Sequence, residues 1–222
     1  KNNKYIEIKF KKIILACGPI QTPLLIKKSF GNSCLKSEMQ IHLNFRINAV
    51  FDEEINSSLG TIFTRQIQEF IKEGILIMPT NFNKSYLSSG LSNYNNNQIN
   101  MILEKINNMA TYVIQMKSSN SIKISNIYKH PFLFYKFSDS DFEKIKKYLR
   151  TFSKYLFNCK AKKIYLPFKN NVSFNNLKSV DLALSKLKKK HIETLSVHGM
   201  SSAKMSNDKS ENKTERFALD EK

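Results

Sequence analysis

Residues 41–51 read IHLNFRINAVF, and the first seven of them alternate between apolar and polar side chains. Side chains of a β-strand point to its two faces in turn, so Ile41, Leu43, Phe45 and Ile47 share one face. Apolar side chains on one face and polar ones on the other are typical of a strand with one face in the core. We therefore expect a strand here that is buried on one side.

Outward from this stretch, several short apolar runs also indicate strands. Most connections between them are too short for the crossovers that parallel pairing needs, so an antiparallel sheet is expected. Residues 117–120, KSSN, have the composition of a hairpin turn. The further predicted strands are Thr61–Ile67, Gly74–Met78, Thr111–Met116, Ser121–Ile127 and Leu133–Phe137.

The clearest predicted helix runs from Ser138 to Cys159. Ser138 stands three residues before Asp141, an arrangement typical of a capping box. Apolar residues then recur at helical spacing and predict one buried stripe; they are Phe142, Ile145, Leu149, Phe152 and Leu156. Shorter helices are expected at 98–109 and 180–190. The fold class predicted is α+β, with an antiparallel sheet backed by helices.

The first 31 residues suggest a different unit. The run Ile13–Ala16 is continuously apolar and precedes Gly18, as in a buried parallel strand. Thr22 and Pro23 are typical of a helix start, and we expect that helix to end near Gly31. Such a strand-turn-helix unit allows backbone N–H groups to face a phosphate or a flavin.

The chain is strongly basic, with a net charge of +18, which raises the possibility of nucleic-acid binding. Only four of its 36 basic residues are arginine, although arginine is favoured for bidentate phosphate and base recognition. The lysines are spread along the whole chain. We therefore expect no specific nucleic-acid partner, and keep a basic nucleic-acid-binding module as the less favoured alternative. No apolar run is long enough to predict a membrane span.

The three cysteines, Cys17, Cys34 and Cys159, have no C-x-x-C spacing and predict neither a disulfide framework nor a zinc site. The apolar or helical surroundings of Cys17 and Cys159 predict buried thiols in a reducing compartment, which favours the cytoplasm. His42, His130 and His191 lack the spacing of metal ligands, so no metal is expected.

Two segments resemble signatures of the glucose-methanol-choline (GMC) family of flavin-dependent alcohol oxidoreductases. They are residues 18–29, GPIQTPLLIKKS, and residues 198–205, HGMSSAKM. The resemblance implies FAD as cofactor, a small-molecule alcohol as substrate and hydride transfer from a CH–OH group to the flavin. It also implies that His198 is the catalytic acid-base residue. The implied FAD-binding residues are Ala16, Cys17, Gly18 and Pro19.

The same resemblance implies three segments. Residues 1–40 would belong to the FAD-binding domain, 41–190 to the substrate-binding domain, and 191–222 to an FAD-domain segment that carries the active site. No G-x-G-x-x-G motif is present in the 222 residues, although a dinucleotide-binding domain needs one. We therefore expect a fragment that lacks this motif and the C-terminal end, and that neither holds FAD nor turns over substrate alone.

This chain departs from the family pattern at three positions. Ser201 and Ser206 replace glycines of the histidine motif, and Asn44 stands where a histidine is common. If the two serines require positive φ angles, each costs about 1 kcal/mol. A non-catalytic GMC-like remnant therefore remains an alternative to an enzyme.

Overall fold

The computed structural model describes residues 6–31, 35, 38–61, 63–80, 96–127, 130–169 and 173–203. This part of the chain is a mixed α+β structure, with an eight-stranded, mainly antiparallel sheet and four α-helices. The predicted antiparallel α+β class is thereby confirmed. The chain divides into a larger unit, 40–121 with 135–198, and a smaller unit, 1–39 with 122–134 and 199–222. The functional division at residues 40 and 190 stays a prediction.

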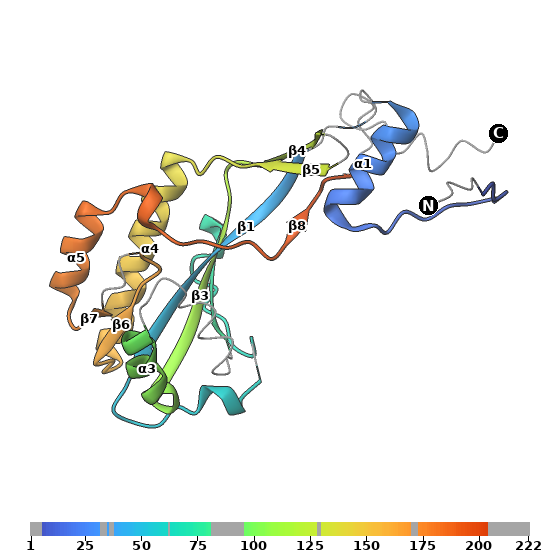
Figure 1. Cartoon of the computed structure of the whole chain (residues 1–222). Coiled ribbons are helices and arrows are strands. Elements are labelled where there is room, and N and C mark those ends of the chain that lie inside the picture. Colours follow the sequence, from blue (N-terminus) through green and yellow to red (C-terminus); the bar gives the residue numbers. More distant parts are fainter. Residues whose placement is uncertain are drawn as a thin grey trace. The chain divides into compact units, whose positions relative to one another are not determined.

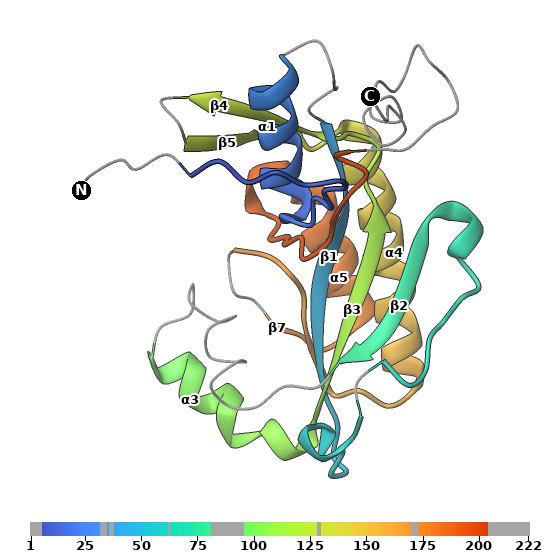
Figure 2. The same cartoon turned by 90° about the vertical axis from the view of Figure 1, so that its right-hand side faces the viewer.

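The sheet of the larger unit is built around β1 (Glu38–Val50), whose residues from 40 onward belong to this unit. β3 (Met109–Lys117) pairs antiparallel with β1 from His42–Lys117 to Val50–Met109. β2 (Ile75–Thr80) pairs antiparallel with the other edge of β3. Figure 2 shows these three long strands side by side. The short strands β6 (Lys163–Tyr165) and β7 (Ser173–Phe174) continue the pairing from the end of β1.

The alternation predicted for β1 is confirmed. Its odd-numbered residues from Ile41 to Ala49 are all buried, with Phe45 and Ile47 fully inaccessible. Helix α4 (Asp139–Asn158) covers this face of the sheet, as Figure 1 shows. The rings of Tyr112 on β3 and Phe152 on α4 meet edge to face, with centroids 5.1 Å apart.

Helix α4 forms as its sequence predicts. The Ser138 side chain accepts a hydrogen bond from the Asp141 backbone N–H, which caps the helix, and the whole predicted apolar stripe is buried. Helix α5 (Leu177–Lys186) packs beside α4, and Arg150 pairs with Asp181 through two hydrogen bonds of 2.7 and 3.1 Å. Helix α5 begins three residues before the predicted start, because Asn176 caps it through a hydrogen bond from the Ser179 N–H.

The prediction of a hairpin with its turn at residues 117–120 is wrong, because the strands on either side of this segment do not pair with each other. β3 pairs with β1 and β2, whereas β4 (Ile122–Ile127) pairs with β1 and with β5 (His130–Phe134). The reason lies in the loop, where Asp141 Oδ2 accepts hydrogen bonds from the Ser119 N–H at 2.9 Å and from both Ser118 and Ser119 hydroxyls. These bonds hold the loop against the start of α4, and the β-turn is not formed.

In the smaller unit, β4 and β5 form the hairpin, and β5 starts three residues before the predicted Leu133. The parallel strand predicted at Ile13–Ala16 is absent, and Ile14 is 91% exposed. A buried parallel strand needs a partner strand and cover on both faces. The described residues provide neither for this run.

Helix α1 (Gly18–Phe30) ends where predicted, but it begins at Gly18 and not at the predicted start marked by Thr22 and Pro23. Pro19 occupies its first turn, where a missing N–H has no consequence, and Pro23 lies inside the helix. Cys17 and Cys159 are exposed, which corrects the prediction of buried thiols, because both lie at helix ends.

Of the two other predicted elements, the helix at 98–109 is confirmed and the strand at 61–67 is not. α3 (Asn96–Glu104), followed by a 3₁₀ turn at Ile106–Asn108, confirms the predicted helix. The prediction of a strand at Thr61–Ile67 is wrong, since of its described residues only Ile67 pairs, in an isolated bridge with Ile77.

Cys34, Ser206 and the rest of 204–222 lie outside the described residues. Within the described ranges, no helix has the length and hydropathy required to cross a membrane.

The packing of Phe152 gives a test of the core. Phe152 is 3% exposed and contacts Tyr112, so Phe152→Ala should lower the free energy of unfolding by about 3–5 kcal/mol. Leu182→Ala on α5, where the side chain is 58% exposed, is the control and should cost about 0.5 kcal/mol or less. Urea unfolding followed by circular dichroism measures both. Equal costs for the two variants would contradict the packing described.

Candidate functional site

The face of the sheet opposite α4 carries the polar residues of β1. The pairing register places them in rows that cross three strands: Asn44 lies beside Gln115 on β3, and Gln115 beside Leu76 on β2. The next row joins Arg46, Val113 and Met78 in the same way. These rows form the floor of a pocket within the larger unit.

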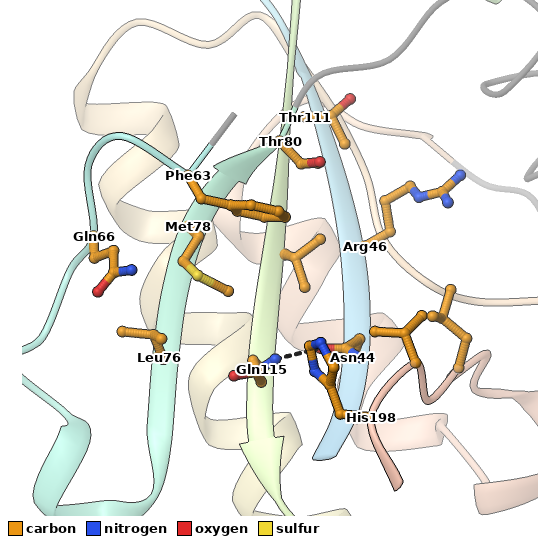
Figure 3. Close-up of a pocket in the computed structure, with 13 residues that line it drawn as sticks. Asn44, Arg46, Phe63, Gln66, Leu76, Met78, Thr80, Thr111, Gln115 and His198 are labelled. Atoms are coloured by element: carbon orange, nitrogen blue, oxygen red, sulfur yellow. Dashed lines mark hydrogen bonds between the residues drawn. The ribbon is translucent and has the colours of Figure 1, made fainter. Parts of the chain in front are cut away.

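Two segments form the walls of this pocket, which we call the sheet trough. One wall comes from residues 195–198, and the other from Phe63 and Gln66. Figure 3 shows the Phe63 ring over the strands on one side and His198 beside Asn44 on the other. The trough has a volume of about 480 Å³, within the usual range of small-molecule sites. The described residues that line it are Asn44, Arg46, Phe63, Gln66, Leu76, Met78, Thr80, Thr111, Val113, Gln115, Leu195, Val197 and His198.

The wall that carries His198 is held to β1 by backbone hydrogen bonds. The Asn44 N–H donates to the Leu195 carbonyl at 2.8 Å, and the Leu195 N–H donates to the Asn44 carbonyl at 3.2 Å. The Thr194 hydroxyl also donates to the Asn44 carbonyl, at 3.3 Å. Pairing with β1 therefore brings the segment that carries His198 to the trough, although about 150 residues of chain separate the two.

The polar groups in the floor differ in how they are paired. Asn44 is 6% exposed, and its Oδ1 accepts a hydrogen bond from Gln115 Nε2 at 3.3 Å. Its Nδ2 is buried and has no hydrogen-bond partner among the described residues. By contrast, Asn48 lies four residues further along β1, and its Oδ1 accepts a hydrogen bond of 2.7 Å from the Thr111 hydroxyl.

His42 lies next to His198. Their rings meet edge to face with centroids 6.3 Å apart. Partial burial is the main cause that lowers the pKa of His42 below its ordinary value of 6.5, and the positive charges of His198 and Lys117 lower it further. His42 Nδ1 is buried without a hydrogen-bond partner among the described residues. His198 itself is exposed and accessible from the trough.

The predicted FAD-binding residues lie in the smaller unit, at the start of α1. Gly18 has a φ of 78°, and a Cβ added there would meet no atom within 4 Å. This φ requires glycine, and the space beside Gly18 is open. Cys17 and Ala16 are exposed, and Cys17 provides no side-chain cap for the helix.

The residues that follow His198 belong to the smaller unit as well. A side chain at Gly199 would collide with Met39 and crowd Pro19, whose Cγ lies 3.1 Å from the added Cβ. Ser201 has a φ of 57°, a conformation that costs an L-residue about 1 kcal/mol. The structure thus requires positive φ at one of the two positions where the resemblance implies a glycine. Ser206 lies outside the described residues.

The structure therefore brings His198 together with Asn44, Gln115 and Arg46 in one unit, and keeps Ala16–Pro19 together in the other. The catalytic role of His198 and the FAD-binding role of Ala16–Pro19 stay predictions. Sequence reasoning assigned no role to Arg46 and Gln115. The alternation of β1 could have placed Asn44 and Arg46 on one face, but their neighbours on β2 and β3 depend on a register that the sequence does not reveal.

Neither a family model nor a curated protein matches this chain. Among the described residues, no three His, Cys, Asp or Glu side chains form a group that could hold a metal ion.

The environment of His42 predicts a dependence of stability on pH. Because the folded-state pKa of His42 lies below 6.5, the unfolded chain binds the proton more readily. Stability should therefore fall as the pH drops from about 6.5 toward that lower pKa. In His42→Gln, the free energy of unfolding should fall less between pH 7.5 and pH 5.5 than in the wild type. His130→Gln, an exposed histidine of β5, controls for removal of a histidine. Parallel losses in wild type and His42→Gln would contradict the assignment.

Proposed function

We propose that this chain is the substrate-binding part of an FAD-dependent oxidoreductase that oxidises an alcohol to a carbonyl, with His198 as the acid-base residue. One observation carries the proposal: the histidine of the HGMSSAKM motif lines a trough of small-molecule size. The trough also holds a buried amide and an apolar surface, which are the usual components of a ligand site.

The chemistry requires a base at this place. A carbinol carbon releases hydride readily only as the hydroxyl proton is removed, and histidine is the side chain that exchanges protons near neutral pH. His198 is exposed on the wall of the trough and can meet a hydroxyl group there. In this proposal it accepts the hydroxyl proton of the bound alcohol.

The residues at the start of α1 are compatible with a flavin. The open space beside Gly18 and the exposure of Ala16 and Cys17 allow close approach of a planar cofactor, and Pro19 occupies the first turn of the helix. FAD, when bound, supplies the hydride acceptor. This chain contributes the orientation of the alcohol, its proton acceptor and part of the cofactor-facing backbone.

Ser201 supports a second candidate, a GMC-like remnant without catalysis. Its φ of 57° places a serine where the backbone favours glycine. The resulting strain, about 1 kcal/mol, is small compared with the stability of a typical domain, so the loop can form with serine. The enzyme proposal is therefore retained as the main one.

His198→Ala tests the enzyme proposal in the intact flavoprotein. The variant should keep its FAD but reduce the flavin with alcohol about 10²–10⁴-fold more slowly, because it lacks the proton acceptor. Its pH profile should also lose the limb near neutrality. Stopped-flow absorbance under anaerobic conditions measures the rate, and His130→Ala, outside the trough, is the matched control.

An unchanged rate in His198→Ala would contradict the role of His198. If the wild-type flavin is not reduced by any alcohol, the non-catalytic remnant becomes the better description.

A further inference from the structure

Among the described residues of the sheet trough, Asn44 is buried and its hydrogen bonding is incomplete. It is 6% exposed, so water reaches little of it, and its Oδ1 is engaged by Gln115 Nε2 at 3.3 Å. The Nδ2 is buried without a partner among the described residues. A buried donor without an acceptor costs free energy, and such a group in a folded protein is explained by strain, by a bound water or ion, or by a functional role.

The surroundings determine where a ligand acceptor would bind. The Gln115 bond fixes the orientation of the Asn44 amide, and the backbone bonds to Leu195 place the wall with His198 beside it. Figure 3 shows the Asn44 side chain next to the His198 ring in the trough, with the Gln115 bond drawn as a dashed line. A residue with a hydrogen-bond donor and a residue with a proton acceptor thus both line the trough.

We propose that the Asn44 side-chain amide donates a hydrogen bond to the oxygen of a neutral, mainly apolar alcohol bound in the sheet trough. This inference rests on the proposed function and names the substrate class of the same site. Gln115 is a positioning residue, because it acts through Asn44.

The hydrogen-bonding capacity of a hydroxyl group matches this pair. A hydroxyl has one O–H donor and two acceptor lone pairs, so the same oxygen can donate to His198 and accept from Asn44. As the proton leaves, negative charge grows on the oxygen, and an amide donor already in place stabilises it. The carbonyl oxygen that results is an acceptor and keeps the Asn44 bond.

The rest of the trough selects the body of the ligand. Leu76, Met78 and Val113 form an apolar floor, and Phe63 lies over it. Additional hydroxyl groups of a polyol would meet these apolar side chains and lose their hydration. None of the thirteen described lining residues is acidic, so a cationic amino alcohol would lose its hydration without gaining a counter-ion among them.

Ligand binding to the 222-residue chain without flavin tests this inference separately from catalysis. The probes are 1-octanol and, for charge, octylammonium at pH 7, each titrated and followed by NMR chemical shifts. Asn44→Leu keeps the size and branching of the side chain and removes the donor. It should weaken 1-octanol binding about 3–10-fold, the range for one lost hydrogen bond.

The control removes a buried polar group away from the trough. Asn48 lies on the same strand and face and is 5% exposed, but its Oδ1 accepts a hydrogen bond from the hydroxyl of the lining residue Thr111, so Ser153→Ala on α4 is used instead. Ser153 is 0% exposed, its hydroxyl has no partner among the described residues, and it does not line the trough. Ser153→Ala should bind 1-octanol as the wild type does, and octylammonium should bind wild type about tenfold more weakly than 1-octanol. Should Asn44→Leu fail to fold, Gln115→Leu takes its place, since it releases the Asn44 amide from its orientation and should also weaken binding.

Undiminished 1-octanol binding in a folded Asn44→Leu, or in Gln115→Leu as its replacement, would overturn the assignment of Asn44. Equal binding of octylammonium and 1-octanol would overturn the substrate class, and so would an absence of 1-octanol binding to the wild type. Because the assay contains no flavin, Asn44-dependent binding together with an inert flavoprotein would refute the proposed function alone.

Discussion

The register between β1 and β3 is the constraint on which the rest of the structure depends. Antiparallel pairing from His42–Lys117 to Val50–Met109 decides which side chains face α4 and which face the trough. Because side chains alternate along a strand, a slip of one residue would exchange the two faces. Phe45 would then be exposed, and the amide of Asn44 would lie in the apolar core at a cost of about 1–3 kcal/mol. The pairing of β1 with β3 therefore fixes both the packing of the core against α4 and the lining of the trough.

The same strand also positions the histidine motif. The backbone of Asn44 pairs with Leu195, and its side chain lines the trough. One residue of β1 thus links the core, the wall that carries His198 and the unpaired amide. In the proposed reaction this link matters, because a misplacement of about 1 Å can slow an oriented reaction about 10²-fold.

Local signals in the sequence predicted some elements well and others poorly. The capping box at Ser138 and the apolar stripe predicted α4, because both act within a few residues of the chain. The alternation of β1 likewise needed no partner to be recognised. The run Ile13–Ala16 looked like a buried strand, but burial depends on neighbours that the described residues do not provide. The turn at 117–120 was misread because Asp141, more than twenty residues away, holds it through hydrogen bonds. The trough was only partly predictable, since Gln115 and Leu76 reach Asn44 through a register that local pattern does not encode.

Transfer of hydride from an alcohol to a bound flavin is the central claim, and isotopic substitution tests it most directly. The intact protein, mixed anaerobically with a primary alcohol, should show flavin absorbance that bleaches. Deuterium at both hydrogens of the carbinol carbon should slow the bleaching, because that C–H bond breaks in the hydride-transfer step. A protein without flavin absorbance, or a flavin that no alcohol bleaches, would contradict the account.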